Sequence, residues 1–301
     1  MTHIHNDELL SALDTRYYEP EIARYLSDAA TVRYRIRVEQ ALMTVLAARG
    51  IAPASAPSEV AVAGEKITVV DVQREEDRVH HDLRALVNCL REHVSAEVRP
   101  YIHLSATSAD VVDTARSLAY RDALNNVLIP AFKDLLKTLI GIARREAQTV
   151  QIGRTHGQHA VPLTFGFAVA GYVSRLGECV VNLERLTNEL LGMCSGAVGA
   201  CNPSSLIVDN PKSFEREVLA ELGLKQVKHS TQVMPTESFI RLFSEITIAT
   251  GVFANIADDM RHLQRSEIGE VGEAFASTQV GSSTMPHKKN PISFENVNSL
   301  W

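Results

Sequence analysis

The longest regular pattern of apolar positions lies between Glu237 and Phe275, where apolar residues recur at alternating steps of three and four. No proline occurs from Thr236 to Met285, and charged residues such as Arg241 take other positions. This spacing predicts a long helix that belongs to a bundle. The apolar positions are Phe239, Leu242, Ile246, Ala249, Phe253, Ile256, Met260 and Leu263.

Two further apolar seams have the same spacing. One extends from Val169 to Leu190, and the other from Leu128 to Ile142. Pro130 lies near the start of the latter seam, where a proline acts as a kink or as a first-turn residue. Three long helices with such seams predict a helical bundle.

The preceding residues contain shorter helical patterns. The clearest covers Val32 to Ala47, and an amphipathic segment spans Val69 to Val98 before Pro100. No alternating run of Val and Ile predicts a strand. We therefore expect an all-α protein with a small N-terminal helical domain, residues 1–110, and a partial long-helix bundle, residues 111–301. The last residues, Phe294 to Trp301, look like the start of another helix, so we expect a truncated chain that lacks a C-terminal domain.

Composition narrows the class of protein. Hydrophobic residues make up 45% and charged residues 22%, which excludes a disordered or collagen-like chain. The net charge of -6 argues against nucleic acid or anionic lipid as a partner. The four cysteines lack zinc-binding spacing, and the N-terminus lacks a signal-like apolar region. We expect a cytoplasmic protein.

Four polar segments interrupt the apolar patterns, at residues 79–82, 106–110, 153–159 and 281–291. Taken alone, most have ordinary structural explanations. Thr107, Ser108 and Asp110 are typical of a helix N-terminus, and a single histidine such as His156 is often structural. His80 and His81 are adjacent, and adjacent residues on a helix point about 100° apart, which argues against a shared metal ion.

The segment 281–291 has no such explanation. It contains two prolines, a glycine, hydroxyl residues, His287, two lysines and Asn290, so it is neither a helix nor a buried strand. Main-chain N–H groups together with the ammonium of Lys288 could hold a carboxylate. We interpret the segment as an anion-binding loop.

This loop, GSSTMPHKKNP, resembles the signature GSSxMPxKxNP of the fumarase/aspartase superfamily, with eight fixed positions in eleven. His287 is similar to the branch that contains the adenylosuccinate lyase and carboxymuconate cycloisomerase families. Other segments resemble motifs of the adenylosuccinate lyase family: residues 107–114, 153–157, 195–199 and 230–232. Arg16-Tyr17 and His81-Asp82 favour that family over the cycloisomerases.

The resemblance implies a β-elimination that releases fumarate, from adenylosuccinate to give AMP and from SAICAR to give AICAR. It implies Ser282 as the base, activated by N–H donors and Lys288, and His156 as the acid that protonates the departing nitrogen, with Glu295 as the partner of that histidine. An aci-carboxylate forms on the way and needs cationic and hydrogen-bonding groups. Lys288, Asn290, Thr107 and Ser108 are implied in that role.

The resemblance also implies the residues that bind the substrate. Arg16, Tyr17, His81 and Gln232 would hold the nucleotide and succinyl groups, and His80, Asp82 and His103 are included in the expected binding set. No metal or organic cofactor is implied. Members of the family are tetramers whose sites take residues from three subunits, so we expect a homo-oligomer. Two further bundle helices and a third helical domain would follow Trp301.

Two other functions remain open at this stage. A related enzyme, similar to the carboxymuconate cycloisomerases, would keep the Ser282 and His156 chemistry and act on another carboxylated substrate. Alternatively, the chain is an inactive truncated assembly subunit. The presence of Ser282, His156 and Lys288 argues against the inactive subunit.

Overall fold

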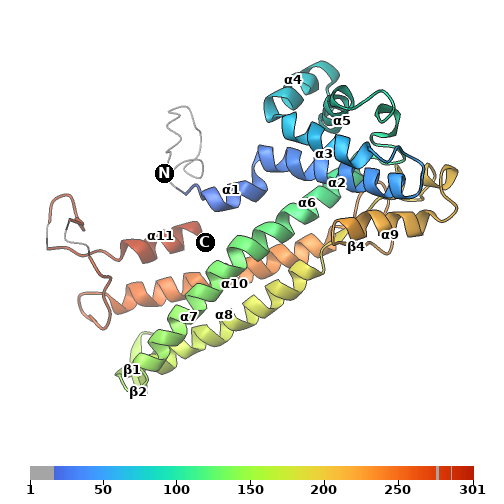
Figure 1. Ribbon diagram of the computed structural model, residues 1–301. Helices are drawn as coiled ribbons and strands as arrows, with labels where there is room; N and C mark the ends of the chain where they lie inside the picture. The colour runs from blue at the N-terminus through green and yellow to red at the C-terminus, as the bar shows by residue number, and fades with distance from the viewer. Residues whose placement is uncertain (1–16, 276–277, 286) are drawn as a thin grey trace. The chain divides into compact units, whose positions relative to one another are not determined.

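The computed structural model describes residues 17–275, 278–285 and 287–301 (Figure 1). As expected, the described chain is built from helices, with a few short strands. It packs into two compact units. Unit 1 comprises the described residues up to Leu128 together with Thr187–Phe239, and unit 2 comprises Ile129–Leu186 together with Ile240–Trp301. The predicted domain boundary near residue 110 falls inside unit 1 and stays a prediction.

Unit 1 is a cluster of helices around a core to which α2 and α5 contribute the most residues. The helix α2 lies against α3 and α6, and its buried residues include Leu42, Met43 and Leu46. Ser27 caps α2, since its Oγ accepts a hydrogen bond from the N–H of Ala30 at 3.2 Å. The helices are α1 (Pro20–Leu26), α2 (Asp28–Ala48), α3 (Ala56–Lys66), α4 (Val69–Val79), α5 (Asp82–His93), α6 (Ser108–Ala123) and α9 (Pro211–Glu221).

Short elements complete unit 1. Two 3-10 turns, Arg99–Tyr101 and Ser204–Leu206, lie in its loops. The strands β3 (Leu191–Gly192) and β4 (Lys225–Gln226) form a two-stranded parallel sheet. A π-helical segment, Leu124–Leu128, follows α6 and leads directly into the first helix of unit 2.

Unit 2 contains the three long helices that the apolar seams predict: α7 (Ile129–Arg145), α8 (Phe165–Asn188, up to Leu186 in this unit) and α10 (Glu237–Leu263, from Ile240 onward). Pro130 lies in the first turn of α7, as its position suggested. Phe132 of α7 meets Phe253 of α10 edge to face, with ring centroids 5.0 Å apart. Lys133 pairs with Glu184 of α8 at 2.5 Å. The helical-bundle prediction is confirmed.

The helix α10 is also long and apolar enough to cross a membrane, by length and composition alone. One such helix is weak evidence, because core helices of bundles pass the same test. In unit 2, Tyr172 hydrogen-bonds Asp259, and Arg175 donates to Asn255 at 2.8 Å, so polar side chains also join α8 to α10. These contacts indicate a bundle helix.

Two predicted helices have different bounds. The segment from Val69 to Val98 is broken, because His80 adopts the left-handed conformation with φ 55° and ends α4, and His81 caps α5. The seam predicted up to Phe275 ends as a helix at Leu263. Its regular apolar positions also stop there, and the chain then turns through Gly269, whose φ is 62°. The predicted terminal helix is present as α11 (Ile292–Leu300).

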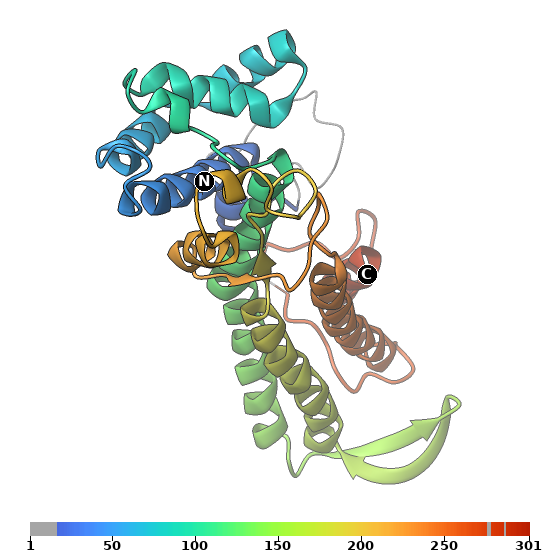
Figure 2. The same cartoon turned by 90° about the vertical axis from the view of Figure 1, so that its right-hand side faces the viewer.

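A β-hairpin in unit 2 was not predicted. The strands β1 (Val150–Thr155) and β2 (Gln158–Thr164) pair antiparallel and are joined by His156 and Gly157 (Figure 2). Both joining residues have positive φ, 54° and 74°, which is typical of a two-residue type I′ turn. The register shifts at Gly153, where a Cβ would lie 2.7 Å from the carbonyl oxygen of Val161.

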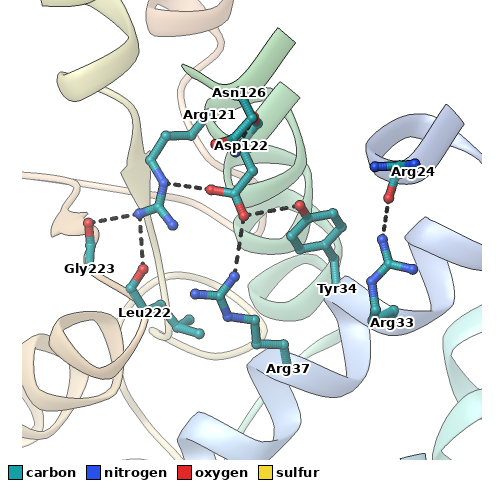
Figure 3. Close-up of polar contacts among 9 residues, drawn as sticks. All are labelled: Arg24, Arg33, Tyr34, Arg37, Arg121, Asp122, Asn126, Leu222 and Gly223. Atoms are coloured by element: carbon teal, nitrogen blue, oxygen red, sulfur yellow. Dashed lines mark hydrogen bonds and ion pairs between the residues drawn. The ribbon is translucent and has the colours of Figure 1, made fainter. Parts of the chain in front are cut away.

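A polar network in unit 1 centres on Asp122 of α6 (Figure 3). Its carboxylate accepts hydrogen bonds from the Tyr34 hydroxyl at 3.0 Å and from Arg37 at 3.3 Å, both on α2. Arg121 donates to the other oxygen at 3.1 Å and also to the carbonyl groups of residues 222 and 223, after α9. Burial, and next the charge of Asp122, raise the pKa of Tyr34. The network therefore links three segments of unit 1.

We expect Asp122→Asn to lower the free energy of unfolding by about 1–3 kcal/mol, because a neutral amide offers a single acceptor to these donors. Urea denaturation followed by circular dichroism measures the change. The control is Asp77→Asn, at an exposed position of α4 whose side chain forms no hydrogen bond or ion pair among the described residues. Equal effects of the two substitutions would contradict the role of the network.

Candidate active site

The segment 107–114 begins α6 and supplies the polar groups around which two other motifs are held. Thr107 and Asp110 form a capping box, and the N–H of Thr107 donates to the Asp110 carboxylate at 2.8 Å. The ordinary interpretation of this segment as a helix cap is therefore correct. The segment does more than cap the helix, since its acidic side chains also bind distant backbone.

Asp110 is almost fully buried, with 1% of its surface exposed. One oxygen accepts the N–H of Ser195 at 2.9 Å, and the other accepts the N–H of Gly196 at 3.0 Å. Burial raises the pKa of Asp110, while its three backbone N–H donors oppose that shift. The carboxylate thus fixes the segment 195–199 against the start of α6.

The neighbouring acid, Asp113, holds the third motif. Its carboxylate accepts the N–H of Met234 at 2.9 Å, just after the segment 230–232. The hydroxyl groups of Ser195 and Ser230 are hydrogen-bonded at 2.7 Å. Gly199 lies so close to this segment that a Cβ would be 2.4 Å from the carbonyl oxygen of Ser230. The structure therefore brings the motif segments 107–114, 195–199 and 230–232 together.

Three of the predicted binding residues meet at the start of α5. His81 caps this helix, because its Nδ1 accepts the N–H of Arg84 at 3.3 Å, and its Nε2 lies 3.4 Å from the hydroxyl of Ser108. Asp82 pairs with Arg35 at 2.8 Å. The His81 side chain is half exposed, and Thr107 and Ser108 are half-buried, so this group can reach a ligand.

His103 is held by a buried carboxylate. Its Nδ1 lies 2.6 Å from Glu39, and its backbone N–H donates to the same carboxylate at 3.1 Å. Glu39 is completely buried. Burial alone would lower the pKa of His103, but the hydrogen bond and charge of Glu39 outweigh it and raise the pKa. This contact anchors the loop before α6, and the predicted substrate role of His103 stays a prediction.

The side chains of the other predicted binding residues of unit 1 are held by few contacts. Tyr17 is exposed by 37%, and Gln232 is exposed. His80 occupies the left-handed break between α4 and α5. Arg16 lies outside the described residues. The contacts of the described residues among them assign no ligand, so their roles stay predictions.

In unit 2, the predicted acid His156 lies at the turn of the hairpin and is exposed. The strand β1 is held at both ends by one carboxylate, since Arg154, near the turn, pairs with Glu270 at 2.5 Å and Gln151, near the open end, donates to Glu270 at 2.8 Å. Arg154 in turn holds the pKa of Glu270 below its usual range. This attachment sets the orientation of the turn that carries His156.

The segment 281–291 closes on itself around its first and last residues. The amide of Asn290 donates to the carbonyl oxygen of Gly281 at 3.0 Å, and a Cβ on Gly281 would lie 2.0 Å from the carbonyl oxygen of Lys288. The hydroxyl of Ser282 accepts hydrogen bonds from the N–H groups of Thr284 at 3.3 Å and Met285 at 3.2 Å. The predicted base is therefore already surrounded by backbone donors.

Two residues that the sequence analysis missed hold the C-terminal side of this segment and the helix start that follows it. Gln264 donates to the carbonyl oxygen of Lys289 at 3.2 Å and accepts the N–H of Glu273 at 2.9 Å. The Glu273 carboxylate accepts the N–H groups of Ser293 and Phe294, at 3.3 and 3.1 Å, at the start of α11. Glu273 lies 19 positions before the first residue of α11, so no local sequence signal identifies this contact.

An open cleft of about 950 Å³ lies beside the segment 281–291. It brings together three predicted residues, Lys288, Asn290 and Glu295, and adds two cationic residues that the sequence analysis did not select, Arg261 and Arg265. A cleft with this excess of positive side chains suits an anionic ligand.

The structure does not bring all of the predicted catalytic residues together. Among the described residues, no hydrogen bond or ion pair joins His156 to Glu295, and neither His156 nor Ser282 lines the cleft. Within residues 17–275, 278–285 and 287–301, no group of three His, Cys, Asp or Glu side chains could hold a metal ion.

The close approach of Gly199 to Ser230 gives a sharp prediction. A left-handed backbone alone costs alanine about 1–2 kcal/mol, and we expect that loss for Gly50→Ala, where φ is 69° and no atom lies within 4 Å of the added Cβ. For Gly199→Ala, at φ 74°, we expect the free energy of unfolding to fall further, by about 3 kcal/mol or more, because the added Cβ would also clash with the backbone of residue 230. Urea denaturation of both variants tests this, and similar losses would contradict it.

The His103–Glu39 contact gives a pH dependence. A raised histidine pKa stabilises the folded state fully below the unfolded-state pKa of about 6.5 and loses that effect as the pH rises through the folded-state pKa. We therefore expect the difference in unfolding free energy between the wild type and His103→Gln to be largest at acidic pH and to shrink above that range. Denaturation series from pH 5.5 to 8.5 measure it. A difference that grows with pH would refute this account.

Comparison with known proteins relates this geometry to a family. A family model described as "Lyase" matches residues 18–300. The adenylosuccinate lyase of Archaeoglobus fulgidus is 35% identical over 293 residues, which cover 97% of this chain and 64% of that protein. The adenylosuccinate lyase of Thermotoga maritima is 36% identical over 275 residues, which cover 91% of this chain and 62% of that protein. The chain thus spans less than two thirds of the length of these relatives.

Solved structures of related enzymes have the same fold as this chain. A 3-carboxy-cis,cis-muconate lactonizing enzyme from Pseudomonas putida superposes with a TM-score of 0.81 and 26% identity, covering 93% of this chain and 62% of that one. A fumarate lyase from Mesorhizobium sp. BNC1 gives a TM-score of 0.80 at the same identity and coverage. Because the family model matches nearly the whole chain, and the helical-bundle fold is shared, the chain belongs to the lyase family that its sequence motifs resemble.

Proposed function

We propose that this chain provides the catalytic residues of an adenylosuccinate lyase, which eliminates fumarate from adenylosuccinate to give AMP and from SAICAR to give AICAR. The support comes from the relatives of that name, from the signature loop, and from the arrangement of that loop. The reaction belongs to purine nucleotide biosynthesis, and we place the protein in the cytoplasm. No metal or organic cofactor is required for this chemistry.

The observation that carries the proposal is the environment of Ser282. Removal of a proton from the carbon beside a carboxylate needs a base, and a serine hydroxyl becomes one only when its alkoxide form is stabilised. The N–H groups of Thr284 and Met285 both point at its Oγ. Hydrogen bonds to an anion favour the anionic form. The ammonium of Lys288, on the same loop, would add to this effect when the substrate binds.

Loss of the proton places a second negative charge on the succinyl carboxylate, and this aci-carboxylate must be neutralised before the C–N bond breaks. Lys288 and Asn290 line the cationic cleft of unit 2 and are the proposed donors there. Thr107 and Ser108, at the N-terminus of α6, are proposed as further donors from unit 1, since a helix N-terminus favours negative charge.

His156 is the proposed acid that protonates the departing nitrogen, with Glu295 as its partner. Imidazole is suited to this role because its pKa lies close to working pH. Within one chain these two residues form no hydrogen bond or ion pair among the described residues. We therefore propose that the pair forms between copies, in a homo-oligomer that is a tetramer in the family and whose sites take residues from several subunits.

The substrate would be held by several residues of unit 1. Arg16, Tyr17, His81 and Gln232 are proposed to bind the nucleotide and succinyl groups. Asp82 and Ser108 lie beside His81 and would orient it. His80 and His103 belong to the same proposed binding region, and the anchoring of His103 by Glu39 would fix its position.

A second candidate function is supported by one comparison. The fold matches a muconate lactonizing enzyme with a TM-score of 0.81, at a lower sequence identity than that of the adenylosuccinate lyases. The same base and acid would then act on a carboxymuconate. Turnover of a carboxymuconate, with no turnover of adenylosuccinate, would favour this function.

The test is release of fumarate from adenylosuccinate, followed by ultraviolet absorbance. We expect Ser282→Ala and His156→Ala each to lower kcat by about 100-fold or more, since each removes a proton-transfer group. The matched controls are Ser283→Ala, at the adjacent hydroxyl, and His159→Ala, in the same hairpin, which should leave kcat little changed. Absence of turnover by the intact chain, or equal losses in variants and controls, would contradict the proposal.

A further inference from the structure

A second charged cleft lies in unit 1, on the helices α4 and α5, and none of its residues belongs to the proposed active site. It has a volume of about 460 Å³. We call it the arginine cleft, after the four arginines that line it. Its lining residues are Glu75, Arg78, Arg84, Asn88, Arg91, Glu92 and Arg99.

Helical spacing explains why these side chains meet. Residues 84, 88 and 91 are spaced by four and three positions, so they share one face of α5. Glu75 and Arg78 are three positions apart on α4, which packs against α5. Arg99 follows in the short 3-10 turn after α5. The sequence therefore directs four guanidinium groups toward one opening.

The two carboxylates in the cleft neutralise only part of the charge of the four arginines. Glu75 is committed to Arg78, through two contacts at 2.8 and 2.5 Å, and to Asn88 at 2.5 Å. The hydrogen bond from Arg78, and next that from Asn88, lower the pKa of Glu75 to about 2, so it is anionic at neutral pH. Glu92 is the one further carboxylate of the lining. Four arginines against two glutamates leave an excess of two positive charges, in a chain whose net charge is -6.

Two of the guanidinium groups are available for a ligand. Among the described residues, the side chains of Arg84 and Arg91 form no hydrogen bond or ion pair. Arg99 uses its Nε to donate to the carbonyl oxygen of Arg91 at 2.9 Å, which fixes the guanidinium and leaves its other N–H groups open. An anion bound among these like charges would relieve their mutual repulsion.

We propose that the arginine cleft binds the phosphate group of a small phosphorylated molecule. A phosphate offers several oxygens to planar guanidinium forks at once, whereas a single carboxylate offers two. A nucleic acid would need a basic track along the surface, and the negative charge of the chain does not favour one. This site is independent of the proposed lyase chemistry, because none of its lining residues has a role in that reaction.

The test measures binding of pyrophosphate to the full chain by titration calorimetry at low ionic strength. We expect saturable binding, and an affinity at least about tenfold lower in the Arg84→Gln/Arg91→Gln double variant, since two charge-assisted contacts are lost. The matched control is Arg216→Gln/Arg241→Gln, which removes the same charge at two exposed arginines outside the cleft. This control should bind as the wild type does.

Two outcomes would overturn the proposal. The first is equal weakening in the cleft variant and the control, which would indicate a general effect of charge. The second is unchanged affinity in the cleft variant, which would place the phosphate elsewhere, for example in the proposed active site. The variant Arg84→Lys/Arg91→Lys keeps both charges and provides a folded reference, and we expect it to bind more weakly than the wild type because an ammonium lacks the bidentate fork. Fumarate release is measured on the same samples, so failure of the lyase proposal is detected separately.

Discussion

The loops of unit 1 depend on the need to satisfy three buried carboxylates. Glu39, Asp110 and Glu215 are at most 1% exposed, and a buried carboxylate is costly unless hydrogen bonds surround it. Glu215 accepts the N–H of residue 194, and Asp110 accepts those of residues 195 and 196, so three successive backbone donors are used. Glu39 accepts a hydrogen bond from the backbone N–H of His103 and is hydrogen-bonded to its imidazole ring. Satisfying these acids therefore fixes the loop of His103 and holds the motif segment 195–199 against the start of α6, which carries Thr107 and Ser108.

The sequence predicted the long helices well, because their apolar positions repeat with the helical period over several turns. It failed where single backbone conformations decide the structure. The break at His80 needs a left-handed residue, and neither glycine nor proline marks that position. The hairpin was missed because its second strand, residues 158–164, has consecutive apolar residues instead of alternating ones, which leaves Gly157 as the local signal for a two-residue turn.

The motifs identified segments of the candidate site, but the hydrogen bonds between these segments could not be predicted from the sequence. The capping box at Thr107 and Asp110 is local and was recognisable from spacing. The second use of Asp110 joins residues that are 85 and 86 positions apart. Periodicity carries no information about such contacts, because they depend on how the helices pack. Gly199 likewise looks like an ordinary loop glycine until the neighbouring carbonyl of Ser230 is placed.

The loop that carries Ser282 is tied down near its two ends and exposed in its middle, and this difference suits its proposed role in catalysis. Asn290 ties the last part of the loop to Gly281, Gln264 holds the carbonyl group of Lys289, and Glu273 holds the start of α11. Between these ties, residues 283–285 and 287–289 are exposed. A base that acts on a bound substrate must be preoriented, whereas the groups around it must adjust to the substrate as it enters. Fastening the two ends restricts the serine, and the exposed lysine keeps the freedom to meet an anion.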